Sequence, residues 1–252
     1  MHIQRIGYTP VKGGRHLEHA SVDLALDGPV GDRLFSLVDL ERGRILRTVE
    51  NPALLAGAAR WQDGVLSVEL DGRTITAVPR STGEQLALDY WGRPAAVEVV
   101  QGPWAEAYST HLGREVALTR AVHAGELVFG ASVTVVTTGA LRLLAAKVGH
   151  EVDSARFRAT LVIDTDDLDP HTEDSWAGRE LQVGAARLRV VKAVDRCAVI
   201  DFEPATGASG TRLLQALASY RLRDGRIDFG MYAEVSTAGL VRRADPVQLI
   251  PE

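Results

Sequence analysis

The chain has 252 residues, of which 46% are hydrophobic and 24% are charged, and its formal net charge is −5. This is the composition of an ordinary globular protein, and the acidic balance argues against a general affinity for nucleic acid or anionic membranes. The first residues lack the apolar run of a signal peptide, and no stretch reaches the ~20 apolar residues of a membrane span. With a single cysteine as well, we expect a cytoplasmic protein that does not associate with membranes.

Short apolar and alternating runs predict a mainly β protein. In chain order, the expected strands cover residues 34–38, 65–70, 73–78, 95–100, 133–136, 161–164, 186–193 and 232–236. The segment Asp71-Gly72 predicts a tight hairpin between the second and third of these, because both residues tolerate a positive φ.

Only three helices are expected, over 103–112, 211–221 and a segment around Leu141. In the last segment apolar residues recur at helical spacing, and Thr138 is the predicted N-cap. Short strands with few helices favour a barrel-like fold. The softest boundary lies near residue 121 and divides the chain into residues 1–120 and 121–252, packed together.

Cys197 is the only cysteine of the chain. It cannot form an intramolecular disulfide, so it is an inert core thiol, a nucleophile or a metal ligand. Free cysteine is among the most buried residue types, which favours the inert interpretation. Arg196 stands directly before it and favours the thiolate, the form that attacks or binds a metal. An iron–sulfur cluster normally takes four cysteines and is excluded.

Cationic side chains near turns are the second feature. Lys12 precedes Gly13, Arg33 precedes the first strong strand, and Arg47 comes just after the strand that follows it. Arg156 and Arg158 are two residues apart, which predicts that both lie on one face of the strand entering 161–164. Guanidinium groups suit phosphate because they present a fork of donors. Taken singly, however, each arginine is more often solvated or paired with a carboxylate.

Other motifs carry less. His16 and His19 lack the spacing of a helical zinc site and predict an exposed loop. The acidic run over 164–174 lacks the glycine and terminal glutamate of an EF-hand and predicts a solvated loop. The sequence has no phosphate-binding loop, dinucleotide-binding fingerprint or serine-hydrolase elbow, so these mechanisms lose most of their support.

Eight short motifs in a fixed order carry a family resemblance. They are Tyr8-Thr9-Pro10-Val11-Lys12, Gly31-Asp32-Arg33-Leu34-Phe35-Ser36-Leu37-Val38-Asp39, Leu46-Arg47, Arg156-Phe157-Arg158, Glu173-Asp174-Ser175-Trp176, Arg196-Cys197, Glu203-Pro204-Ala205-Thr206-Gly207 and Phe229-Gly230-Met231-Tyr232. Together they resemble the molybdenum cofactor sulfurase C-terminal (MOSC) domain proteins with their N-terminal β-barrel region, over nearly the whole chain.

The resemblance implies a mainly β, barrel-like MOSC fold that binds the molybdenum cofactor, a phosphate-bearing pterin dithiolene. It implies that Cys197 is the metal ligand. It also implies that Cys197, Arg196 and Tyr232 are the catalytic residues. The residues implied in cofactor binding are Lys12, Arg33, Arg47, Arg156, Arg158 and Thr160. Neither pyridoxal phosphate nor a flavin is expected.

The amidoxime-reducing members of the family suggest an oxidoreductase that reduces N-hydroxylated compounds with electrons from a separate electron-transfer protein. Two alternatives stay open: a cysteine-based sulfurtransferase or carbon–sulfur enzyme without molybdenum, and a non-catalytic cofactor carrier or insertion chaperone. Thr160 stands where the family has asparagine, Gly13 where serine is common, and Ala244 where a glycine is usual. The first two departures leave open a weaker, altered or lost molybdenum site.

Overall fold

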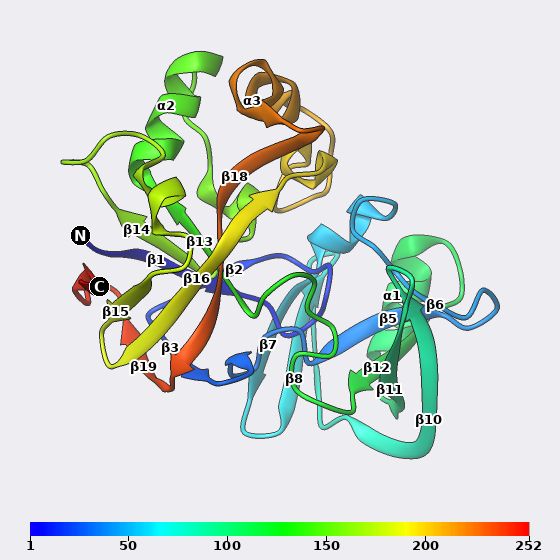
Figure 1. The fold of residues 1–252 in the computed structure, drawn as a ribbon. Helices are drawn as coiled ribbons and strands as arrows, with labels where there is room; N and C mark the ends of the chain where they lie inside the picture. Colours follow the sequence, from blue (N-terminus) through cyan, green and yellow to red (C-terminus); the bar gives the residue numbers. More distant parts are fainter. Residues whose placement is uncertain (252) are drawn as a thin grey trace.

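The computed structural model describes residues 1–251. Its strands build a small closed barrel and a larger open sheet, which lie next to each other (Figure 1). The barrel order is β10 (Arg80–Tyr90), β11 (Arg93–Gln101), β12 (Ala117–Ala121), β5 (Phe35–Asp39) and β6 (Arg44–Ile45). Every residue of β5 is buried, and helix α1 (Trp104–Leu112) packs Trp104 and Tyr108 into the same apolar core.

The larger sheet combines strands from both ends of the chain. Its order is β2 (Leu17–His19), β1 (His2–Tyr8), β14 (Leu161–Asp164), β13 (Val133–Thr137), β18 (Arg226–Thr237), β16 (Ala186–Asp195), β15 (Glu180–Val183) and β20 (Val247–Leu249), with β17 (Leu222–Arg223) paired to β18. Strand β1 pairs antiparallel with β14, with Ile6 opposite Leu161. The beginning of the chain is therefore built into a sheet whose other strands come after the barrel. The division of the chain at residue 120 stays a prediction.

Helices α2 (Thr138–Val148) and α3 (Leu213–Arg221) lie on one side of this sheet (Figure 1). Leu144 of α2 and Leu217 of α3 share an apolar cluster with Phe229 of β18 and Phe157. A second apolar cluster, which includes Ile3 of β1, is formed largely by side chains of the large sheet. This packing fixes the positions of β16 and β18, which carry part of the cavity described below.

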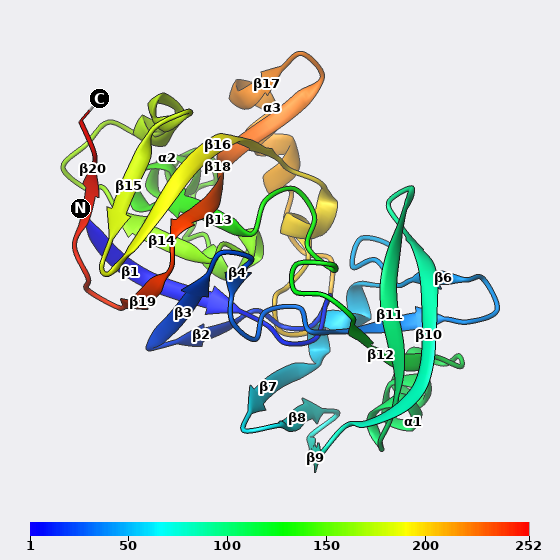
Figure 2. The same cartoon turned by 60° about the horizontal axis from the view of Figure 1, so that its bottom comes forward.

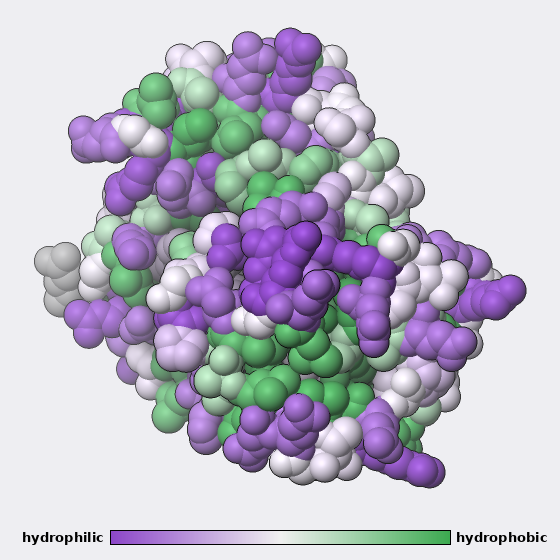
Figure 3. Space-filling view, turned by 90° about the vertical axis from the view of Figure 1, so that its right-hand side faces the viewer, coloured by the Kyte–Doolittle hydropathy of each residue, from purple (hydrophilic) through white to green (hydrophobic). Residues whose placement is uncertain are grey.

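Two small sheets and four 3-10 turns complete the fold. They are β19 (Gly239–Arg242), β3 (Ser21–Ala25) and β4 (Gly28–Pro29); β7 (Ala58–Gln62), β8 (Val65–Leu70) and β9 (Arg73–Ala77); and η1 (Pro52–Ala56), η2 (Ser154–Phe157), η3 (Thr172–Trp176) and η4 (Ala198–Asp201). The segment between β12 and β13 joins the barrel to the sheet (Figure 2). On the side that carries the barrel, hydrophilic side chains gather next to an apolar area (Figure 3).

The mainly β prediction is confirmed, and each predicted strand and helix overlaps an observed one. The turn at Asp71-Gly72 has φ values of 51° and 73°, as a two-residue hairpin of this type requires. The predicted cap of α2 is displaced by one residue. Thr137, not Thr138, accepts from the Ala140 amide, and Thr138 is the first helical residue.

Three further local predictions are wrong. Arg156 and Arg158 do not share a strand face, because Arg156 lies in the turn η2 and Arg158 ends it with a left-handed φ of 51°. His16 does not lie in an exposed loop but is 4% exposed. The acidic run is not uniformly solvated, since Glu173 is fully buried and accepts from the Thr137 hydroxyl at 2.8 Å.

The pair Arg221–Asp174 ties η3 to α3. Both terminal nitrogens of Arg221 donate to the Asp174 carboxylate, at 2.7 and 2.9 Å, and Nε donates to the Asp228 carbonyl at 2.8 Å. Arg221 is 4% exposed. Replacing Asp174 by asparagine removes the partner of a buried cation, so we expect a loss of about 2–3 kcal/mol in the free energy of unfolding, slightly less than for a fully buried pair. Urea unfolding of D174N, with the exposed D167N as control, measures this; an unchanged midpoint would contradict it.

Candidate functional site

A cavity of about 700 Å³ opens between the barrel and the large sheet. The barrel side contributes Tyr90 and Trp91, and the sheet side contributes the end of β16, η4 and Tyr232 of β18. Eight of the nine residues predicted from the sequence line this cavity: Lys12, Arg33, Arg47, Arg156, Arg158, Arg196, Cys197 and Tyr232. Tertiary structure thus brings together side chains separated by up to 220 positions in the chain, from Lys12 to Tyr232.

Cys197 lies on the cavity wall at the end of β16. The strand stops at Asp195, and the Arg196 amide donates to the Ile227 carbonyl at 2.9 Å. Cys197 then adopts an extended backbone and precedes the turn η4. Its side chain is exposed, so the inert core thiol considered above does not describe it. A reactant or metal in the cavity can reach the sulfur.

Arg196 is held rigidly beside Cys197. Its Nε donates to the Phe229 carbonyl and one terminal nitrogen donates to the Phe157 carbonyl, both at 2.8 Å. The other terminal nitrogen is buried without a partner. Burial lowers the pKa of Arg196 to about 10, against the effects of Tyr232 and Cys197, which raise it. Arg196 therefore remains a cation at neutral pH and has one N–H donor free for an anion.

Tyr232 stands on β18 and is 9% exposed. Burial raises the pKa of its hydroxyl, while Arg196 and Arg33 act in the opposite direction. Gly130 lies directly against the ring, since a Cβ there would come within 2.4 Å of it. The phenol is thus packed in place and stays protonated at neutral pH, as a donor into the cavity.

Lys12 and Arg158 are two further cations that line the cavity. Neither forms an ion pair with a carboxylate within residues 1–251. The Lys12 ammonium lies 4.5 Å from the centre of the Tyr90 ring, and Arg158 donates to the Gly14 carbonyl at 2.7 Å. Burial, and then the neighbouring Arg33, lowers the pKa of both, to about 10 for Arg158 and well below the ordinary value for Lys12. Cations held together at this cost form a site for an anion.

The other three predicted cations are each paired. Arg33 contacts Asp32 at 2.6 Å, Arg47 contacts Asp89 at 3.0 Å, and Arg156 contacts Glu203 at 2.7 Å. Asp32 is itself fixed, because it accepts from the Thr9 amide at 3.1 Å. Such pairs fix the direction of each guanidinium and leave its remaining donors for a ligand.

Thr160 is not on the cavity wall. It is 2% exposed, and its hydroxyl accepts from the Thr134 amide at 3.2 Å. Thr134 does line the cavity, so Thr160 contacts a residue of the cavity wall without lining the cavity itself. The Thr160 hydroxyl is therefore engaged in a hydrogen bond within the protein.

Sequence analysis missed several residues of the cavity. The aromatic side chains among them are Tyr90, Trp91 and Phe129, and the charged ones are Lys192, Asp195 and Arg226. The dipeptide Trp91-Gly92 in a hairpin turn was a readable signal, because a tryptophan is unusual at a position that favours asparagine. Nothing in the local sequence distinguishes Lys192 or Arg226 from other exposed cations.

Residues 110–248 match the family model of the MOSC domain, which is more than half of the chain. The chain belongs to the MOSC domain family. It is 32% identical over 125 residues to mitochondrial amidoxime-reducing component 1 of Mus musculus, and 31% identical over 125 residues to that of Homo sapiens. Each alignment covers 46% of this chain and 36% of the relative, so the chain matches little more than a third of the length of these curated relatives.

Among solved structures, the YUAD protein from Bacillus subtilis aligns with 98% of this MOSC chain and 93% of its own, at 12% identity and a TM-score of 0.47. No helix within residues 1–251 is both long and apolar enough to cross a bilayer.

Proposed function

We propose that this MOSC protein holds the molybdenum cofactor in the cavity and reduces N-hydroxylated compounds, converting N–O to N–H. One observation carries the proposal: an exposed thiol and three cations without carboxylate partners face the same cavity. The thiol is Cys197, and the cations are Lys12, Arg158 and Arg196. The likeness to amidoxime-reducing relatives supports the same reaction class.

The donor set fits this cofactor. Thiolate is a soft ligand of the kind that a thiophilic metal takes, and Cys197 supplies one at an accessible place. The phosphate and pterin carry negative charge and hydrogen-bonding groups, which suit the clustered guanidinium donors. Lys12, Arg33, Arg47, Arg156 and Arg158 would hold these parts, with Thr160 supporting Thr134. When bound, the cofactor supplies the two-electron redox chemistry.

The chain's own groups then orient substrate and provide protons. Tyr232 has a protonated hydroxyl in the cavity, which can donate to an N–O oxygen as negative charge develops there. The Arg196 cation lies close enough to lower the pKa of Tyr232 and would stabilise negative charge in the same region. Neither Tyr232 nor Arg196 carries electrons, so in this proposal the electrons come from a separate electron-transfer protein. We place the reaction in the cytoplasm. A flavin or pyridoxal phosphate has no role in this proposal.

Elemental analysis and turnover test the proposal together. Protein from a host that makes the cofactor should contain near-stoichiometric molybdenum and pterin, and should reduce an amidoxime with an artificial electron donor. Molybdenum without turnover of any N-hydroxylated compound would favour a cofactor carrier. Absence of molybdenum would overturn the proposal and favour Cys197 as a persulfide-bearing nucleophile.

A further inference from the structure

Two exposed aromatic side chains meet at the mouth of the cavity. Trp91 is 45% exposed and Phe129 is 57% exposed, and both line the cavity. Their ring centres are 5.5 Å apart at an interplanar angle of 48°. Trp91 comes from the barrel turn between β10 and β11, and Phe129 comes from the segment joining β12 to β13. Large apolar side chains left exposed at a cavity mouth point to a ligand that covers them.

The backbone at Trp91 is costly for a tryptophan. Trp91 and Gly92 have φ values of 57° and 80°, and Tyr90 pairs with Arg93 across a two-residue turn. Such turns favour asparagine or glycine at the first of these positions, and a bulky residue there is strained. The turn itself therefore does not call for tryptophan. The role of this side chain lies in what its ring contacts.

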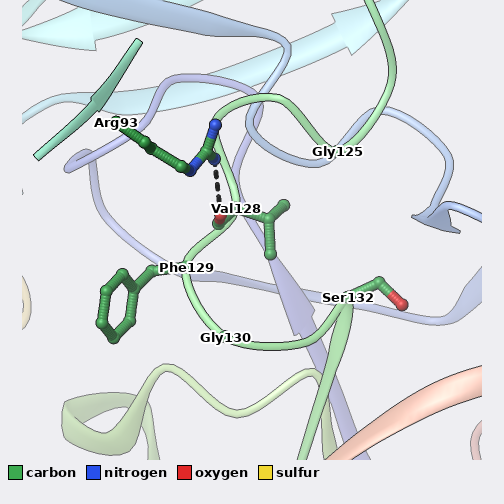
Figure 4. A pocket seen from close by; sticks show the side chains of 6 residues that line it. All are labelled: Arg93, Gly125, Val128, Phe129, Gly130 and Ser132. Atoms are coloured by element: carbon green, nitrogen blue, oxygen red, sulfur yellow. Dashed lines mark hydrogen bonds between the residues drawn. The ribbon is translucent and has the colours of Figure 1, made fainter. Parts of the chain in front are cut away.

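Arg93 connects the two segments that carry the aromatic pair. One terminal nitrogen of Arg93 donates to the Val128 carbonyl at 3.2 Å (Figure 4). The same nitrogen donates to the Glu126 carbonyl at 2.6 Å. The Glu126 carboxylate accepts from the amide of Ala96 in β11 at 3.0 Å, which is a second link between the two segments. The turn with Trp91 and the segment with Phe129 are thereby held as one unit, so the pair is a preformed surface.

The contacts around the pair leave aromatic surface available. The Arg47 guanidinium lies 4.3 Å from the centre of the Trp91 ring and stacks on it. Phe129 has more than half of its surface free. The same cavity is lined by the apolar side chains Val194, Val199 and Ile200 near Cys197. A flat ring entering the mouth therefore meets aromatic surface at the mouth and aliphatic surface further along the wall.

We propose that Trp91 and Phe129 form a ring-binding subsite that selects N-hydroxylated compounds whose reducible group is carried by a flat aromatic or heteroaromatic ring. The subsite rests on the proposed function for the identity of the reducible group. Its ring recognition is tested at Trp91 and Phe129, whose contact with a ring does not require the cofactor. A pterin has a flat ring too, so the experiment separates substrate from cofactor.

Benzamidoxime and acetamidoxime carry the same reducible group on a ring and on a methyl, and they make a matched pair of probes. In the loaded enzyme, Trp91→Asn and Phe129→Ala should each lower the ratio of kcat/KM for benzamidoxime over acetamidoxime about fivefold to tenfold, as expected for loss of one aromatic contact. This loss should appear as a higher KM for benzamidoxime. Leu222→Ala is the control, since Leu222 is 56% exposed and lies outside the cavity, and its ratio should equal that of wild type.

Two further measurements make the result decisive. Trp91→Asn places a favoured residue in the turn, so its melting temperature should equal or exceed that of wild type; with the fold intact, a lost preference is a lost contact. Molybdenum and pterin content should match wild type. An unchanged ratio in both variants, or a fall in their pterin content, would overturn the subsite. If the wild-type protein holds no molybdenum, ligand-observed NMR of benzamidoxime on the unloaded chain still tests it, and equal binding by wild type and both variants overturns it.

Discussion

Replacing Cys197 by serine is expected to remove most of the bound molybdenum and to lower turnover at least ~100-fold, because loss of even an outer-shell partner of a metal ligand costs 10–100-fold. A hydroxyl has nearly the shape of the thiol, but it is a hard donor that stays protonated at neutral pH. Molybdenum analysis and steady-state turnover of C197S, beside wild type prepared in parallel, measure both effects.

The fold should not change in C197S. Cys197 is exposed, and no other residue depends on its side chain for a hydrogen bond within residues 1–251. The free energy of unfolding should stay within about 0.5 kcal/mol of wild type, as for other exposed substitutions. Ala198→Ser is the matched control, because it adds a hydroxyl one residue later and keeps the thiol. Full molybdenum in C197S would remove Cys197 as a ligand.

Replacing Lys12 by methionine should act in opposite directions on the empty and the loaded protein. In the empty protein the ammonium is buried and repelled by Arg33 and Arg158, so its removal relieves an unfavourable charge. Loss of the contact with Tyr90 offsets part of this gain. We expect K12M without cofactor to be at least as stable as wild type. When K12M is prepared in a host that makes the cofactor, it should retain ~10-fold less pterin than wild type, since one charge-assisted contact to the anion is lost.

The pH dependence of stability gives an independent check on Lys12. Burial, as the largest cause, lowers the pKa of Lys12 well below its ordinary value of 10.5. The unfolded chain therefore holds this proton over a pH range in which the folded protein has released it. Between the two pKa values the unfolded state binds more protons, so stability rises with pH.

Urea unfolding of the empty protein between neutral pH and pH 10 should show this rise in wild type and a smaller one in K12M. Lys192→Met is the matched control, because Lys192 lines the same cavity but is exposed. It should leave the pH dependence as in wild type. Identical pH profiles for wild type and K12M would contradict a lowered pKa of Lys12 in the folded protein.

Sequence patterns predicted the elements well where the decisive interactions are local. The strands predicted over 65–70 and 73–78, with Asp71-Gly72 between them, form a hairpin in the structure, where the second strand ends at Ala77. The helices near Leu141 and in 211–221 follow from their apolar spacing. In each case neighbours within a few residues decide the backbone geometry, so the sequence carries the signal directly.

The exposure of individual side chains was less predictable. His16 and Glu173 read as solvated but are buried. Residues distant in sequence lie beside them: Leu55 and Pro204 line a small pocket with His16, and Thr137 donates to Glu173. Arg158 was placed on a strand face, yet its left-handed backbone turns it toward Gly14. Local composition gives the chemistry of a side chain, whereas the direction in which it points depends on backbone angles that packing imposes.

The sequence by itself determined the mainly β class, the uniqueness of the Cys197 thiol, the set of cations and the family motifs. Tertiary structure alone decided that eight of these residues face one cavity, that Thr160 supports the wall from behind, and that Trp91 meets Phe129 at the mouth. The physical reason is the range of the interactions. The cavity depends on where the barrel and the sheet meet, and pairings such as β1 with β14 join segments more than 150 residues apart.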